Sequence, residues 1–214
     1  MLVLLGLGTA AFGLSVWLPY HREKLAVKTI ESCGGSVSTV KRSPEWLRRV
    51  VGNARSNEFK IFARIDSVDL NDATITDAEI AQMGGCSSLE VLLVGRTEVT
   101  DDGLALLSEL TNLEILTLNE TAVTDAGLAH LSGLTKLKLL VLDDTPVTDA
   151  GLAKLSGNTK LERLYLSGTL VSDSGLVHLS KLTKLRRLGL ERTMVTSKGI
   201  EELRKALPDC VIHH

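Results

Sequence analysis

The strongest constraint on this chain is a 24-residue period that runs through its second half. A degenerate copy of the repeated pattern begins at Ile65, and clear copies begin at Leu89, Leu113, Leu137, Leu161 and Leu185. A fixed period of this length predicts a solenoid, in which each repeat packs only on its neighbours. Because stacked repeats make an extended surface and not a pocket, the period also favours a binding function over a catalytic one.

Each repeat predicts one strand followed by one helix. The L-x-x-L-x-L stretch alternates its Leu residues inward, so six strands should form a parallel sheet on the concave side of a horseshoe, with helices on the convex side. Thr124 and Asp125 then resemble an N-cap followed by an acidic first turn, and Leu128 and Leu131 share the buried helix face. We expect the hydroxyl of Thr121, and of its counterparts, to bond to the turn of the neighbouring coil.

The pattern L-x-x-L-x-L-x-x-T-x-V-T-D-x-G-L resembles the leucine-rich-repeat family in its short variety, over Ile65 to about Pro208. The T-D-x-G-L segment is similar to that of a cysteine-containing subfamily found in ubiquitin-ligase receptors, with Thr in place of Cys. The order of apolar segment, short cap and repeats resembles bacterial membrane-anchored leucine-rich-repeat proteins of unknown function. The resemblance implies an α/β horseshoe that binds protein through its concave sheet.

Residues 1–20 contain no charged side chain, which predicts a transmembrane anchor. Trp17 and Tyr20 end the segment, where aromatic rings favour the membrane interface. A cleaved signal peptide is the alternative and would make the protein secreted, but no basic residue precedes the apolar run and residues 15–19 make a poor cleavage site. The nearby Lys and Arg follow the segment, which places the repeats in the cytoplasm, whereas a basic leader further upstream would reverse that orientation.

Residues 21–64 predict a basic juxtamembrane and N-terminal capping segment, with ten Lys/Arg against four Asp/Glu. We expect a helix over 24–32 with Leu25, Val27 and Ile30 on its apolar face, a strand over 36–40, and a second helix over 45–51. Such a segment covers the first repeat, whose core would otherwise meet water, and its basic face is equally compatible with anionic lipid head groups. At the other end, residues 209–214 predict a closing strand at 210–212 and a tail that includes His213.

Several kinds of chemistry are not expected. Residues 65–214 carry fourteen Lys/Arg against twenty-two Asp/Glu, which argues against nucleic acid as a ligand. The recurring Asp column is accounted for by helix capping, so no metal is expected, and the three distant cysteines have no zinc or redox spacing. A Gly6-x-Gly8-x-x-Ala11 pattern lacks the amphipathic helix of a dinucleotide site. We therefore predict a non-enzyme with no cofactor and no small-molecule substrate.

Strand positions that alternate away from the core define the candidate binding site. An apolar patch is predicted in the middle of the concave sheet, with acidic residues along one side and arginines toward the C-terminal end. Tyr165 is the one aromatic residue of the array and the strongest single candidate for binding energy. The predicted site residues are Val91, Leu93, Ile115, Thr117, Leu139, Val141, Asp143, Arg163, Tyr165 and Arg187.

These patterns favour a single-pass membrane protein that acts as a protein-binding scaffold. Two alternatives stay open. The first is a structural envelope protein whose array self-associates, which concentration-dependent sedimentation would detect. The second is a substrate receptor of the ubiquitin-ligase type, which would need an F-box-like segment that residues 21–64 do not supply.

Overall fold

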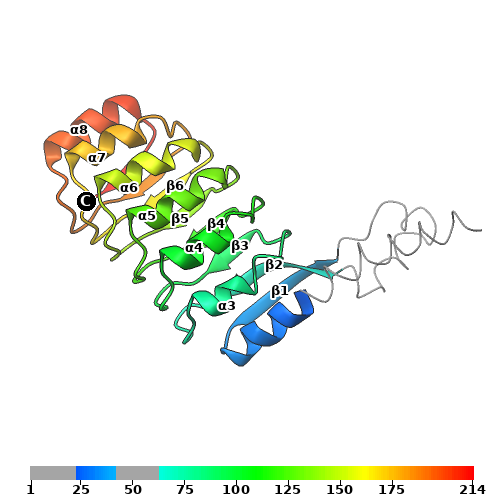
Figure 1. Ribbon diagram of the computed structural model, residues 1–214. Coiled ribbons are helices and arrows are strands. Elements are labelled where there is room, and N and C mark those ends of the chain that lie inside the picture. The colour runs from blue at the N-terminus through cyan, green and yellow to red at the C-terminus, as the bar shows by residue number, and fades with distance from the viewer. Residues whose placement is uncertain (1–22, 42–62) are drawn as a thin grey trace, which may run out of the picture.

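A computed structural model describes residues 23–41 and 63–214 of the chain. These residues form a solenoid with an eight-stranded sheet along one side and a row of short helices along the other (Figure 1). The spatial order of the strands is their order in the sequence, because each repeat adds one strand beside the last. The predicted anchor at residues 1–20 and the predicted helix at 45–51 lie outside the described residues.

The sheet is parallel from β2 onward, and β1 alone pairs antiparallel with its neighbour. The strands are β1 (Ser36–Lys41), β2 (Ala63–Asp69), β3 (Val91–Leu93), β4 (Ile115–Thr117), β5 (Leu139–Val141), β6 (Arg163–Tyr165), β7 (Arg187–Gly189) and β8 (Val211–His213). Equivalent residues are in register, so each column of the repeat becomes a row across the sheet.

The opposite side carries one helix per repeat, in two cases extended by a 3-10 turn. The helices are α3 (Asp77–Ala81), α4 (Asp101–Leu107), α5 (Asp125–Leu128), α6 (Asp149–Lys154), α7 (Asp173–Leu179) and α8 (Ser197–Ala206), and the 3-10 turns are η2 (Ala129–Gly133) and η3 (Leu155–Gly157). The predicted Thr and Ser N-caps of α4 to α7 are confirmed, because each side chain accepts a hydrogen bond from the backbone two residues on.

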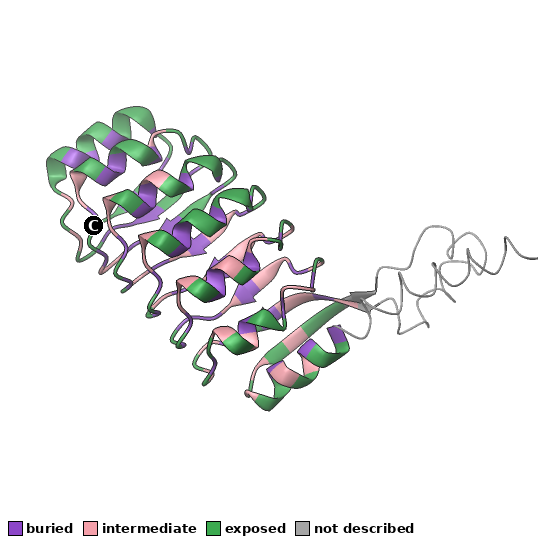
Figure 2. Cartoon of the chain, in the orientation of Figure 1, coloured by how far each residue is buried: buried purple, intermediate pink, exposed green. Residues whose placement is uncertain are grey.

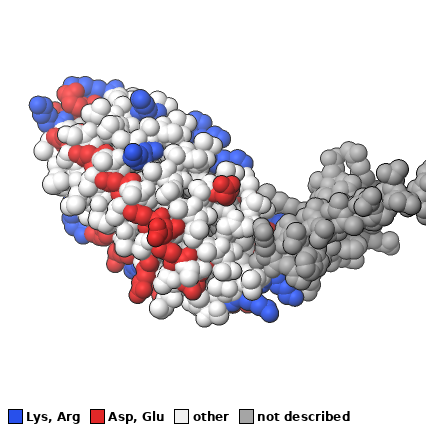
Figure 3. Space-filling view, in the orientation of Figure 1, with Lys and Arg blue, Asp and Glu red and all other residues white. Residues whose placement is uncertain are grey.

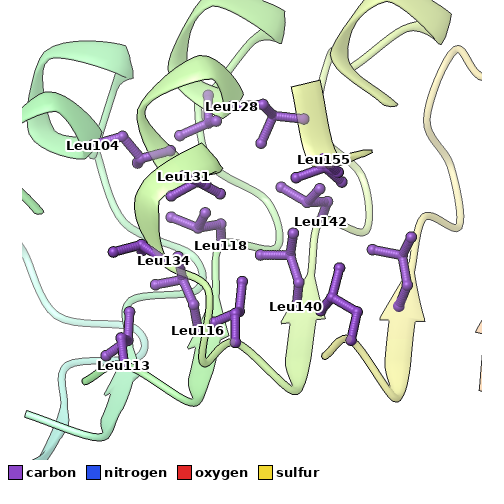
Figure 4. Close-up of a cluster of buried hydrophobic side chains, with 14 of the residues drawn as sticks. Leu104, Leu113, Leu116, Leu118, Leu128, Leu131, Leu134, Leu140, Leu142 and Leu155 are labelled. Atoms are coloured by element: carbon purple, nitrogen blue, oxygen red, sulfur yellow. The ribbon is translucent and has the colours of Figure 1, made fainter. Parts of the chain in front are cut away.

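The core lies between the sheet and the helices and consists largely of stacked leucines. Leu116, Leu118 and Leu128 of one repeat are completely buried against Leu140 and Leu142 of the next (Figure 4). Buried residues accordingly run through the strands from β2 to β8, while the outer faces of the helices are exposed (Figure 2). Deleting one such Leu side chain typically costs about 2–5 kcal/mol, so the leucine column is the main source of stability.

Residues 23–32 are helical and lie against the first repeat. The predicted buried face is confirmed for Ile30, which lies in the core, and for Val27, which packs against it, but Leu25 is 56% exposed and Ala26 is buried instead. Residues four apart share a helix face, and Ala26 and Ile30 satisfy that spacing. The buried Glu23 carboxylate accepts a hydrogen bond from the backbone N–H of Ile65 at 3.2 Å, which ties this helix to β2.

The buried Thr column was predicted incorrectly in one respect. The hydroxyl of Thr121 donates to the carbonyl of Leu118 in its own turn at 2.7 Å, and not to a neighbouring coil. Thr97, Thr145 and Thr169 make the same three-residue bond. The Thr column therefore closes the turn within each repeat, and contacts between repeats have another origin.

The C-terminal end is closed by α8 and β8. The last strand begins one residue later than predicted, and His213, which was expected in a tail, ends it: its carbonyl accepts from the backbone N–H of Leu190 at 2.8 Å. Ile212 is buried against the last repeat while Val211 and His213 are exposed. The alternation of the repeats thus continues into the terminal strand.

Candidate protein-binding face

The side of the sheet that faces away from the helices is the predicted concave face. Strand register places two rows of side chains on it. We call the apolar part of these rows the concave strip: Val91, Leu93, Ile115, Leu139, Val141 and Tyr165. Each is partly exposed, whereas the residue between the two rows on every strand is buried.

The remaining predicted site residues frame the concave strip. Thr117 is Cα partner to Leu93 and Val141, so it interrupts the apolar row with a hydroxyl at its middle. Arg163 and Arg187 follow Leu139 in the other row and are exposed. The structure therefore brings nine of the ten predicted residues onto three-residue strands of one face.

Tyr165 has a defined place at the C-terminal end of the concave strip. Its strand partner Gly189 is buried, and a Cβ added to that glycine would come within 3.0 Å of the Tyr165 ring. The ring therefore lies over the neighbouring strand in space that any other residue at 189 would fill. A tyrosine fixed in this way presents a rigid apolar surface with little conformational entropy left to lose on binding.

Asp143, the tenth predicted residue, lies beyond the strand and is half-buried. Its carboxylate accepts a hydrogen bond from the backbone N–H of Ser167 at 2.6 Å in the next repeat. Burial raises the pKa of Asp143, against the opposing effect of the Ser167 hydrogen bonds. The side chain is thus occupied in joining repeats, a role that the strand alternation did not predict.

The acidic side of the predicted site is partly neutralised within the chain. Asp72 pairs with Arg96 at 2.6 Å, and Asp144 pairs with Arg192 at 3.0 Å. Arg192 reaches Asp144 across two repeats because Gly168 lies between them without a side chain. The four charged residues of these two ion pairs, together with Glu120, adopt a positive φ between 53° and 61°. The sequence did not predict this conformation, which is uncommon for residues other than glycine.

Aspartates at the helix starts form a second series of hydrogen bonds between repeats, which the sequence analysis did not predict. Asp125 accepts two hydrogen bonds from Thr148 of the next repeat, at 2.8 Å from the backbone N–H and 2.6 Å from the hydroxyl. The same pair of bonds joins Asp77 to Thr100, Asp101 to Thr124, Asp149 to Ser172 and Asp173 to Thr196. The Thr196 hydroxyl and then its backbone N–H lower the pKa of Asp173. The recurring T-D-x-G spacing was the available signal.

Acidic side chains accordingly form a band along the array (Figure 3). Among the described residues, no group of three or more His, Cys, Asp or Glu side chains is arranged to hold a metal ion. Cys86 is buried in the core, where burial, and to a lesser extent the nearby Glu23 carboxylate, raises the pKa of its thiol to about 12.

Stacked strand–turn–helix repeats with this leucine pattern define the leucine-rich-repeat fold. Solved structures with the same fold include internalin F from Listeria monocytogenes (TM-score 0.57, 24% identity), internalin C2 from the same organism (0.54, 22%) and the ectodomain of the receptor kinase SOBIR1 from Arabidopsis thaliana (0.54, 15%). The matches cover 65%, 69% and 82% of this chain, and 38%, 70% and 94% of those chains, respectively. This chain therefore spans well under half of the internalin F structure.

The resemblance to leucine-rich repeats is thus confirmed at the level of the fold. No protein-family model matches the sequence, and no curated protein matches it. Within residues 23–41 and 63–214, no helix has the length and apolar character needed to cross a bilayer.

Proposed function

We propose that this chain is a membrane-anchored scaffold that binds a partner protein on its concave strip. The observation that carries the proposal is the continuity of apolar side chains across β3 to β6, in register and partly exposed, on a sheet whose opposite face already supplies the core. Contiguous apolar surface with a polar surround is the usual anatomy of a protein interface. The leucine-rich-repeat fold supports the same general role.

Val141 and Tyr165 provide the sharpest test because they are strand partners at the centre and end of the concave strip. The full chain is crosslinked in intact cells, and captured proteins are identified by mass spectrometry. The Val141→Asp/Tyr165→Asp variant should lose a protein that the wild type holds. Val177→Asp is the matched control, since Val177 is an apolar residue of α7 that is 68% exposed; it should capture the same protein as the wild type.

If the wild type, the concave variant and the Val177→Asp control captured the same proteins, the concave strip would be refuted as a binding site. Capture of the chain itself, lost only in the concave variant, would instead support the self-associating structural role. Sedimentation of the wild type and the concave variant at several concentrations would then separate a second copy from a foreign partner.

Anchoring through residues 1–20 rests on their uncharged, apolar sequence. A chain anchored by one helix should stay with the membrane pellet after extraction at alkaline pH, and a chain that lacks residues 1–20 should not. Release of the full chain by that extraction would contradict the anchor. The compartment of the captured partner would give the side of the membrane on which the repeats lie.

A further inference from the structure

Two arginines stand side by side at the C-terminal end of the concave strip. Arg163 of β6 and Arg187 of β7 are Cα partners, and both are exposed. Neighbouring strands are about 4.8 Å apart, so the two side chains leave the sheet close together. Like charges directly opposite each other on a sheet are destabilising, so this placement needs a compensating anion or a functional reason.

No carboxylate within the described residues compensates the pair. Three other arginines of the array pair with carboxylates: Arg96 with Asp72, Arg186 with Asp209 and Arg192 with Asp144. The side chains of Arg163 and Arg187 make no ion pair or hydrogen bond with the part of the chain that the structure describes. Their planar guanidinium groups are left available for the paired hydrogen bonds that a carboxylate accepts.

The apolar neighbours of the arginine pair indicate what kind of anion is expected. Arg163 is the direct strand partner of Leu139, and Tyr165 lies two residues beyond it on the same strand. An anion bound here should therefore belong to a molecule that also carries apolar groups, which contact the concave strip. A protein segment that carries Asp or Glu beside apolar residues has both properties.

The charge of the rest of the array disfavours larger anions. Residues 65–214 carry fourteen Lys/Arg against twenty-two Asp/Glu, so a polyanion or an anionic membrane would be repelled beyond the arginine pair. We propose that Arg163 and Arg187 select partners whose binding segment places an Asp or Glu next to its apolar residues. This proposal rests on the function proposed above and adds the chemistry of the partner.

In the test, peptides that bind the full 214-residue chain in detergent micelles are selected from a displayed library of random sequences. Three chains are compared: the wild type, Arg163→Gln/Arg187→Gln, and the charge-matched control Arg204→Gln/Lys205→Gln on the outer helix α8. Peptides selected by the wild type and by the control should be rich in apolar residues with adjacent Asp or Glu. Peptides selected by the concave arginine variant should keep the apolar residues and lose the acidic ones.

The affinity of a synthetic peptide with the selected sequence then measures how much the arginine pair contributes to binding. Its affinity should fall by about ten-fold or more in Arg163→Gln/Arg187→Gln, because charge-assisted hydrogen bonds are lost, and change less than about two-fold in the control. Arg163→Lys/Arg187→Lys keeps the charge without the fork geometry and should fall between them. The glutamine variant should unfold at the same temperature as the wild type or a higher one, since a like-charge contact is removed.

Three results would overturn the proposal, and they are distinguishable. Apolar peptides without acidic residues would refute the arginine selection while leaving the concave strip in place. Peptides whose selection is unaffected by Val141→Asp/Tyr165→Asp would refute the strip as well. Binding of phosphatidylserine vesicles that depends on the arginine pair, with no acidic peptide selected, would assign the pair to lipid instead.

Discussion

The carboxylate of Asp101 holds both the backbone N–H of Thr124, at 2.8 Å, and its hydroxyl, at 2.6 Å, across the boundary between two repeats. The Thr124 hydroxyl in turn accepts the backbone N–H of Ala126 at the start of α5. Each helix start is therefore fixed by the helix start before it. The T-D pair of the repeat acts as a connector between coils as well as a cap.

Replacement of Asp101 by Ala should lower the free energy of unfolding by about 2 kcal/mol, since the Thr124 donors lose a charged acceptor. Asp102 is the matched control, because it occupies the same first turn of α4 but is exposed and has no such partner in the next repeat. Asp102→Ala should cost only the helix-dipole effect, about 0.5 kcal/mol. Equal losses in urea unfolding would show that the aspartates act through the dipole alone.

Gly127 tests the same connection from the other side. A Cβ on Gly127 would collide with the Asp101 carboxylate, so Gly127→Ala should destabilise the chain by about 1–3 kcal/mol. Helix propensity alone predicts the opposite sign, a gain of about 1 kcal/mol. The control is Gly133→Ala, whose added Cβ would meet nothing within 4 Å and should cause little loss.

Combining Asp101→Ala with Gly127→Ala should cost less than the sum of the two, because removal of the carboxylate makes room for the methyl group. Strict additivity in thermal unfolding would mean that the two positions do not share the contact described above.

Asn158 occupies the buried column that holds leucine in neighbouring repeats. Its amide donates to the carbonyls of Leu131 and Leu134, but its side-chain oxygen has no partner. Both carbonyls also accept a backbone N–H, so Asn158→Leu leaves them satisfied and removes the unpaired oxygen. We expect Asn158→Leu to raise the free energy of unfolding by about 1 kcal/mol and Asn158→Ala to lower it by about 2 kcal/mol. A lower free energy of unfolding for Asn158→Leu than for the wild type would contradict this account of the buried column.

Sequence periodicity predicted the elements of each repeat because its signals are local. Leucine spacing identifies the strand and the inward helix face, and Thr before Asp identifies the cap. The link between Asp101 and Thr124 was missed because it joins residues 23 positions apart, and only the stacking of coils brings them together. For the candidate site, alternation predicted which side chains leave the core. It could not show that Asp143 bonds to the next repeat or that the Tyr165 ring lies over Gly189.

The buried thiol of Cys86 gives a pH-dependent prediction. An unfolded Cys loses its proton near its ordinary pKa of 9.0, whereas folding raises the pKa of Cys86 to about 12. The unfolded state therefore binds fewer protons between these values, and the thiol's contribution to stability falls as the pH rises through that window. The wild-type advantage over Cys86→Ala should shrink between about pH 9 and pH 11. An advantage that stays constant over this range would show that the thiol ionises normally in the folded chain; Cys33→Ala, at a partly exposed position, is the control.

Tyr165 gives the most direct measurement of the central claim, that the concave strip binds a partner. Once a partner is captured, its dissociation constant is measured for the wild type, Tyr165→Ala and Val177→Ala. Loss of the aromatic contact at the end of the concave strip should weaken binding by more than about 1 kcal/mol, or at least about five-fold, without unfolding the array. Val177→Ala on the opposite side should leave affinity unchanged. Unchanged affinity in a folded Tyr165→Ala chain would contradict the concave strip as the binding surface.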